Sequence, residues 1–405
     1  MTTYYYNEDA TTTVNGLSEA GGYDGSTTAT LPDASSAASR LSSVVNALQS
    51  GDILYVKKTS GEITWHASVT TSTKTTDGPT RATDVGPVDV IGYGTTPGDG
   101  VRPNVNMGSK VWKFRRAAGM IQSINFTGSY ADAGMIEIND GALITQCRIE
   151  SSAGPALLIS DEGKADRCEL INTESVGTPS GYQEYAVILY PSDNAHITNC
   201  YVESRNGSGG IFVRRRAGAA EIRGCIINVN LDVDGAGNLN GHGICLESAG
   251  YNRGSVMNNI IHNASTGLKV DRSGTDDRSP QAFCYNIFSS CSKAIDGNSF
   301  YNQPANTSES RINNPMRSYS NFFYANTSNS FFNNETDPTF LTSDPFVSVA
   351  TKDFTITGST VLTSFGYASN FSGQTGASGD TITENALVPL KPTADVTLPT
   401  IVSFF

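Results

Sequence analysis

The middle of the chain aligns with itself, and this internal repeat limits the possible folds more than any other feature. Segments of the form apolar-x-x-(Cys, Asn or Ile)-x-apolar recur between residues 121 and 288. Their central residues are Ile124, Cys147, Cys168, Cys200, Cys225, Asn259 and Asn286, in steps of 23, 21, 32, 25, 34 and 27 residues. Self-similarity at periods of about 20–50 residues is typical of stacked repeat architectures.

A second apolar segment follows most of the repeated ones. These segments span residues 134–138, 155–159, 186–189, 210–213, 243–246 and 267–270. Alternation with a period of two residues over short runs bounded by Gly, Asn and Ser indicates strands rather than helices. Two short strands cannot bury their own apolar side, but stacked repeats can form one continuous core.

The central column of Cys and Asn residues fits the interior of such a stack. Small buried side chains would lie above one another at about 4.8 Å, and Asn side chains would hydrogen-bond along the column. A metal or redox cysteine cluster is the less favoured interpretation, because buried Cys commonly behaves as a small apolar residue. The chain has 7 cysteines and none in a CxxC pair, which argues against a disulfide framework and a thiolate zinc site.

This pattern resembles the single-stranded right-handed parallel β-helix family, the pectate-lyase-like solenoids, over roughly residues 50–300. The resemblance implies a mostly-β fold with a short N-terminal cap helix and a C-terminal extension. It implies little about activity, because this fold carries lyases, hydrolases, adhesins and viral spikes alike.

The ends of the chain are expected to cap the solenoid. We predict an N-terminal arm and cap over residues 1–50, with a helix within 34–49, and a β-helix over residues 51–364. The motifs of residues 337–356 resemble a segment that closes the core, and residues 365–405 read as a C-terminal docking extension. Residues 4–6, three consecutive tyrosines, read as an exposed aromatic cluster at an interface.

Composition narrows the functional classes. The formal net charge is −12 and charged residues make up 16% of the chain, which disfavours binding to nucleic acid through its phosphates. No apolar run approaches the length of a membrane span. The first residues carry neither a basic nor an apolar stretch typical of a secretory signal, so we expect synthesis in a reducing cytoplasm.

Catalytic candidates are weak. The run Asn240-Gly-His242-Gly and the later Lys269 resemble the Gly-His-Gly motif and basic residue of polygalacturonases. The acidic pair of those enzymes is missing from the preceding repeat, and Asp232 and Asp234 lie only 10 and 8 residues before the histidine. We therefore assign no catalytic residue, and keep His242, Asp232, Asp234 and Lys269 as candidates.

Other polar motifs also have two interpretations. Three arginines at residues 214–216 could bind a carboxylate-bearing sugar or an acidic partner, or could be a solvated face. Acidic turns at residues 161–162, 232–234 and 276–277 have no EF-hand or nonapeptide-repeat spacing. We expect neither a cofactor nor a resident metal.

The features favour a non-catalytic structural protein of a virion, and within virions that of a tailed phage. Within that class we expect a trimeric capsid-decorating, cement or attachment protein. Its partners would be two further copies of the chain, other virion proteins such as the capsid protein, and host surface polysaccharide. The alternative is a tailspike-like depolymerase, a hydrolase or lyase that cleaves host surface glycans. A bacterial adhesin is a third, less favoured option.

Overall fold

The architecture is that of a mostly-β rod. A computed structural model describes residues 1–27, 39–72, 87–115, 118–174, 182–190, 194–205, 209–214, 219–229, 241–248, 254–272, 282–296, 317–329 and 338–356. Within these residues, three parallel sheets contain all strands except one antiparallel pair near the C-terminal side.

Sheet A comprises 11 strands in the described part of the chain. They are β1 (Thr3–Tyr6), β2 (Ile53–Lys57), β5 (Asp89–Tyr93), β8 (Met120–Gln122), β11 (Leu143–Thr145), β14 (Lys164–Asp166), β17 (Asn194–Thr198), β20 (Ala219–Arg223), β23 (Ser255–Met257), β26 (Ala282–Cys284) and β29 (Arg317–Tyr319). One row of aligned positions faces the interior, from Leu54 through Ile144 to Phe283.

Sheet B also has 11 strands among the described residues. They are β3 (Ile63–Thr64), β6 (Asn104–Gly108), β9 (Asn125–Gly128), β12 (Arg148–Ser151), β15 (Glu169–Asn172), β18 (Tyr201–Ser204), β21 (Ile226–Val229), β24 (Ile260–His262), β27 (Ile287–Ser289), β30 (Phe322–Tyr324) and β31 (Thr339–Phe340). Its interior row includes Phe126, Ile149 and Ile261.

Sheet C contributes nine strands to the described structure. They are β4 (Val69–Ser72), β7 (Trp112–Arg115), β10 (Ile136–Ile138), β13 (Leu157–Ser160), β16 (Tyr185–Tyr190), β19 (Gly209–Val213), β22 (His242–Ser248), β25 (Thr266–Arg272) and β28 (Lys293–Asp296). Its interior row includes Trp112, Leu157 and Leu268.

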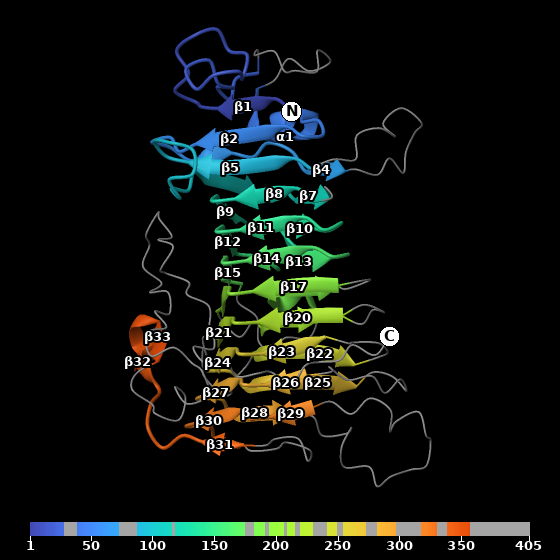
Figure 1. Ribbon diagram of the computed structural model, residues 1–405, viewed down its shortest axis with the longest axis vertical. Coiled ribbons are helices and arrows are strands. Elements are labelled where there is room, and N and C mark those ends of the chain that lie inside the picture. Colours follow the sequence, from blue (N-terminus) through green and yellow to red (C-terminus); the bar gives the residue numbers. More distant parts are fainter. Residues whose placement is uncertain are drawn as a thin grey trace.

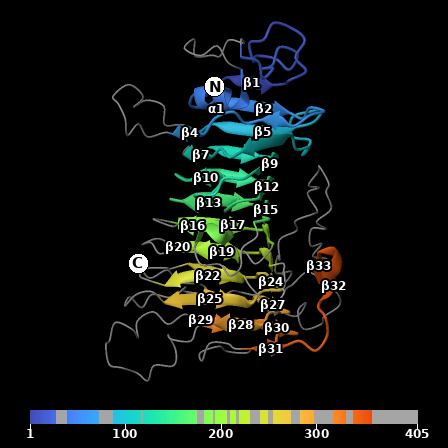
Figure 2. The same cartoon turned by 180° about the vertical axis from the view of Figure 1, so that it is seen from behind.

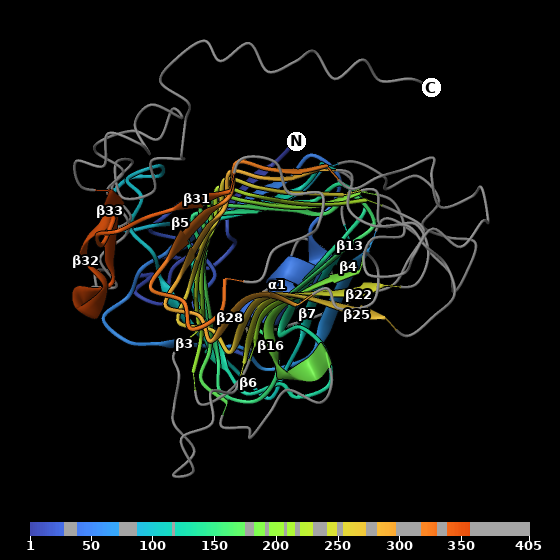
Figure 3. The same cartoon turned by 90° about the horizontal axis from the view of Figure 1, so that it is seen from below.

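The chain visits the sheets in a fixed order. From β2 to β30, each turn adds one strand to sheet A, one to sheet B and one to sheet C, and successive turns pair in parallel. The turns stack along the long axis (Figure 1), sheet C is seen from the opposite side (Figure 2), and the interior is enclosed when viewed along the axis (Figure 3). The fold is a right-handed parallel β-helix, as predicted from the repeat.

The Cys and Asn column lies in the short turn between sheets A and B. A residue with positive φ precedes each member, including Gln146 (54°) and Tyr285 (57°). The column itself is buried: Cys147, Cys168, Cys200, Cys225, Asn259, Asn286 and Asn321. Asn side chains accept hydrogen bonds from the backbone of the preceding turn, at 2.9 Å for Cys225 to Asn259 and 3.1 Å for Asn259 to Asn286. The predicted interior column is confirmed.

The N-terminal end is closed by the first strand and one helix. Strand β1 pairs with β2 in register, and Tyr4 and Tyr6 are buried against the core. Helix α1 (Leu41–Ala47) buries Leu41, Val44 and Val45. The expectation of an exposed tyrosine cluster was therefore wrong for Tyr4 and Tyr6, because period-two alternation turns both rings inward; only Tyr5 faces outward, where it packs on Tyr55 at 5.6 Å between ring centroids.

The segment expected to close the core does so only in part: β31 pairs with β30 at the end of sheet B, whereas residues 346–356 take a different position. Strands β32 (Phe346–Ser348) and β33 (Asp353–Ile356) form an antiparallel hairpin, joined by the 3₁₀ turn η3 (Val349–Thr351). The hairpin lies against the outer face of sheet B rather than across the end of the core (Figure 3). Its Phe346, Phe354 and Ile356 cover an apolar part of that face. The aromatic residues therefore close a side of the rod.

Two further points bear on the sequence predictions. Residues 365–405, Arg215, Arg216, Asp232 and Asp234 lie outside the described residues. Among the residues that are described, no helix is long and apolar enough to cross a bilayer.

Candidate functional site

The outer face of sheet C brings together aromatic and basic side chains on neighbouring turns. Because outward positions recur at every second residue, parallel register places Ile188, Phe212, Cys245 and Lys269 side by side across β16, β19, β22 and β25. We call the surrounding group the sheet C face; it comprises Tyr182, Tyr185, Tyr190, Phe212, Arg214, His242 and Lys269.

The aromatic rings of this face contact one another. The centroid of Phe212 lies 5.1 Å from that of Tyr185 and 6.2 Å from that of Tyr182, in the 3₁₀ turn η1 (Tyr182–Glu184). Gly209 is aligned with Tyr185 in the sheet, and a Cβ atom at Gly209 would lie 2.2 Å from the Tyr185 ring. The glycine therefore lets the tyrosine ring lie directly against β19.

Arg214 follows the last residue of β19 and stacks between two tyrosines. Its guanidinium carbon lies 4.3 Å from the ring centroid of Tyr182 and 4.9 Å from that of Tyr190. A cation this close to an aromatic centroid is attracted to the face of the ring, and a guanidinium carries its N–H donors in its own plane. The stack holds a half-buried cation in a defined orientation at the surface.

His242 lies at the start of β22, next to these rings. Its Nδ1 atom is 2.7 Å from the hydroxyl oxygen of Tyr185. Burial, assisted by the positive charge of Lys269, lowers the pKa of His242 to about 4. The imidazole is therefore neutral near pH 7 and can exchange one hydrogen bond, in either tautomer, with the phenol.

The structure can be compared with the four sequence candidates. It places His242 and Lys269 on the same face, and the charge of Lys269 acts on the histidine. Asp232 and Asp234 lie outside the described residues, so their relation to this pair stays a prediction. Among the described residues, no three His, Cys, Asp or Glu side chains lie close enough together to bind a metal ion.

Sequence reasoning missed the aromatic members of the face. Phe212 was interpreted only as part of a strand, and Tyr185 lies just before the strand predicted over residues 186–189. For Phe212 the available signal was alternation, because it lies between the inward residues Ile211 and Val213. Tyr185 has the same parity as the inward residues Val187 and Leu189, so alternation would have turned it inward, and its contact with Phe212 required the structure.

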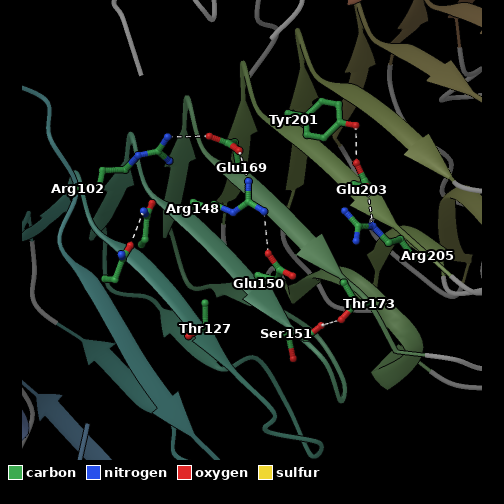
Figure 4. Close-up of polar contacts among 12 residues, drawn as sticks. Arg102, Thr127, Arg148, Glu150, Ser151, Glu169, Thr173, Tyr201, Glu203 and Arg205 are labelled. Atoms are coloured by element: carbon green, nitrogen blue, oxygen red, sulfur yellow. Dashed lines mark hydrogen bonds and ion pairs between the residues drawn. The ribbon is translucent and has the colours of Figure 1, made fainter. Parts of the chain in front are cut away.

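The outer face of sheet B carries a second polar region (Figure 4). Arg148 bonds to Glu150 at 2.7 Å and to Glu169 at 3.0 Å, and Glu169 also accepts a hydrogen bond from Arg102 at 2.9 Å. Farther along the rod, Glu203 accepts hydrogen bonds from Tyr201 at 2.7 Å and Arg205 at 2.5 Å.

A comparison with protein families agrees with the fold. Residues 109–276 match the family model described as a right handed beta helix region. No curated protein sequence matches the chain significantly. Three similar solved structures are polysaccharide lyases.

The first solved structure is a pectate lyase, with 13% identity, a TM-score of 0.46, and coverage of 98% of this chain and 90% of the lyase. The second is a rhamnogalacturonan lyase, with 12% identity, a TM-score of 0.44, and coverage of 86% and 91%. The third is a mannuronic-acid-specific family 6 lyase from the human gut microbiota, with 12% identity, a TM-score of 0.36, and coverage of 84% and 83%.

Proposed function

We propose that the protein binds an acidic polysaccharide along the sheet C face and serves as an attachment protein. One observation carries the proposal: Arg214 is stacked between Tyr182 and Tyr190 beside the exposed part of the Phe212 ring. Aromatic rings offer flat apolar surfaces to sugar rings, and an oriented guanidinium suits a sugar carboxylate.

The position of the face supports a linear ligand. Its members come from four successive turns, so a chain of sugars running parallel to the rod axis could contact several of them. Lys269 adds a second cation on β25, beyond the aromatic rings on β16 and β19. Two cations on a chain with net charge −12 favour an acidic polymer over a neutral one at this face.

Cleavage is the second candidate, and the His242–Tyr185 pair favours it. β-Elimination from a uronate needs a base that removes the proton next to the carboxylate and an acid at the leaving oxygen. A neutral imidazole 2.7 Å from a phenol could supply both groups. We place binding first, because both side chains are buried, whereas Phe212 and Arg214 are partly exposed.

The cellular setting and assembly form part of the same proposal. An attachment protein of a tailed phage, assembled as a homotrimer with the capsid or other virion proteins and made in the host cytoplasm, would present three copies of this face. Several copies raise the avidity for a repeating polymer without any new contact. Light scattering with chromatography would test the trimer, and a monodisperse monomer would remove that part of the proposal.

The binding test compares an acidic and a neutral polymer. We expect polygalacturonate to retard the protein in affinity electrophoresis and dextran not to do so. Arg214→Ala should weaken retardation about tenfold. Arg214→Lys should recover little of the retardation, because lysine lacks the planar guanidinium that lies against the tyrosine rings. Arg223→Ala, an exposed arginine on sheet A, is the matched control. Equal retardation of the Arg214→Ala variant and the wild type would overturn the proposal.

The same samples separate binding from cleavage. Unsaturated sugars released by elimination absorb ultraviolet light, and hydrolysis releases reducing ends. We expect neither signal for the wild type. Turnover that is lost in His242→Ala, while retention on the polymer is kept, would establish the second candidate in place of the first.

A further inference from the structure

The first five strands of sheet A, β1, β2, β5, β8 and β11, are apolar on both faces. Strand β1 contains Tyr4–Tyr6 and strand β2 contains Ile53–Val56, so neither alternates with polar residues. The later strands β14, β17 and β20 do alternate, as in Lys164–Asp166. Parallel strands that are apolar at successive positions are typical of a sheet covered on both faces. We therefore expect a cover over the outer face of these five strands.

The outward side chains of these strands form two aligned rows. We call them the sheet A patch, which comprises Ile53, Asp89, Met120 and Leu143 in one row and Tyr5, Tyr55, Ile91 and Gln122 in the other. All of them are half-buried. On the next turn the two rows continue with Lys164 and Asp166, so the patch ends there, near the middle of the rod (Figure 1). Contiguous apolar groups at a surface mark interaction sites.

Asp89 is the one charged side chain of the patch. Burial raises the pKa of its carboxyl, and no lysine or arginine among the described residues lowers it. Desolvation without a counter-charge disfavours the carboxylate, whereas a nearby cation would favour it. The cover that suits this patch is therefore apolar and carries one positive charge.

The size of the patch favours an extended segment over a second globular surface. Five strands at about 4.8 Å spacing give a length of about 19 Å. Two rows of side chains of this length offer far less than the roughly 800 Å² that each partner of a stable protein pair buries. An extended peptide of about six residues would cover the length of the patch.

A segment with these properties is present in the same chain. Residues 386–394 have the sequence Ala-Leu-Val-Pro-Leu-Lys-Pro-Thr-Ala, in which Lys391 is the one charged residue. It is also the one lysine or arginine within residues 357–405. Each proline favours an extended backbone at the residue before it. The segment therefore matches the patch in polarity, charge and backbone preference.

The segment can also reach the patch. The last described residue is Ile356, and the residues between it and Ala386 can span up to about 100 Å. The 11 strands of sheet A extend over only about 50 Å. A tether of this length keeps the segment at a high effective concentration, so docking needs no second copy of the chain.

We infer that residues 386–394 of the same chain dock across the strands of the sheet A patch, with their apolar side chains over the patch and the Lys391 ammonium beside the Asp89 carboxylate. The docked segment covers the outer face of the first five strands of sheet A. It leaves the sheet C face, and the polysaccharide site proposed there, uncovered.

The test measures oxidation of Met120 in the full chain. Hydrogen peroxide oxidises accessible thioethers, and mass spectrometry gives the rate at each methionine. Met257 is the internal reference, because it is outward and half-buried on β23 of the same sheet but lies outside the patch. Lys391→Asp should speed Met120 oxidation about fivefold by replacing an ion pair with like charges, and Lys391→Arg should not. Adding Asp89→Lys to Lys391→Asp should restore the slow rate.

Two further variants make the outcome decisive. Deletion of residues 386–405 should speed Met120 oxidation without relying on charge, and circular dichroism checks that its β-rich fold is kept. Lys164→Asp, on the turn after the patch, is the matched control and should change nothing. Equal Met120 rates in the wild type, the Lys391→Asp variant and the deletion variant would overturn the inference. Protection of Met120 that grows with protein concentration would overturn the same-chain assignment in favour of a second copy.

Discussion

Lys352, in the turn between β32 and β33, pairs with Glu203 of β18 at 2.5 Å, across 149 residues of sequence. This ion pair connects the C-terminal hairpin to the middle of the rod. Around it, Phe346, Phe354 and Ile356 of the hairpin pack on outward apolar residues of sheet B, including Tyr201 and Ile260. The hairpin is therefore fixed by an apolar contact and by a buried charge.

We predict that Glu203→Gln lowers the free energy of unfolding by about 3 kcal/mol, because the change leaves Lys352 and Arg205 without a carboxylate partner. Glu203 is 1% exposed. Glu62→Gln is the control: Glu62 is exposed, bonds to Asn106 and Thr127 on the same sheet, and should cost about 0.5 kcal/mol. Urea unfolding measures both, and equal costs would contradict the structural role of Glu203.

The same carboxylate should make hairpin docking sensitive to acid. Burial alone would raise the pKa of Glu203, but hydrogen bonds from Lys352, Tyr201 and Arg205 outweigh it and hold the pKa below its usual range. A lowered folded-state pKa means that the stabilisation is present above about pH 4.3 and is lost as the pH falls through the folded value. Hydrogen exchange of residues 346–356 should accelerate there, and Glu203→Gln should remove this dependence.

Two buried histidines should begin to destabilise the protein at a pH above that at which Glu203 is protonated. Burial lowers the pKa of both His242 and His262 to about 4. An unfolded histidine binds its proton below about pH 6.5, so between pH 6.5 and 4 the unfolded state binds more protons than the folded state. The free energy of unfolding therefore decreases as the pH is lowered through this range. Each residue should cost about 3 kcal/mol by pH 4. His262→Leu should remove about half of this loss, measured as urea midpoints against pH; an unchanged slope would contradict the burial of His262.

The Asn half of the interior column should contribute more stability than the Cys half. Asn286 Nδ2 donates to the carbonyl of Val256 and to Asn321 at 3.0 Å each, and its Oδ1 accepts from Asn259. Asn286→Ala should cost about 3 kcal/mol because it leaves several buried groups unpaired. Cys168→Ala, in the matched position, should cost about 1 kcal/mol. Urea unfolding of the two variants compares them directly, and a larger cost for Cys168→Ala would refute this difference.

Sequence periodicity predicted what lies inside the rod. The repeat fixed the positions of Cys147 and Asn286 in the interior turn, because a stack of similar turns places equivalent residues above one another. It also located the segments that hold the strands, but it predicted two strands per repeat where the structure has three, because a turn at the column divides the first segment between sheets A and B. These features are local to one turn or repeat from turn to turn, so they leave a pattern in the sequence.

Contacts on the outside of the rod left no such pattern. The pair Arg102–Glu169 joins residues 67 apart, and Lys352–Glu203 joins residues 149 apart. Each occurs once, so no repeat reveals it. The hairpin was expected at the end of the core because its aromatic residues indicate burial without saying against which surface. His242 and Lys269 were found by motif resemblance, but their aromatic neighbours required the register of sheet C.

Thiol reactivity tests the interior column directly. The seven cysteines are all buried and none forms a disulfide. Burial raises the pKa of Cys147 and Cys200 and brings that of Cys291 to about 12. Because the thiolate is the reactive form, a disulfide reagent at pH 8 should label the native protein slowly. In denaturant the same reagent should label all seven cysteines. Lys164→Cys, at an exposed position of sheet A, provides a reference thiol that should react rapidly. Native Cys168 reacting as fast as that reference would show that the column faces solvent.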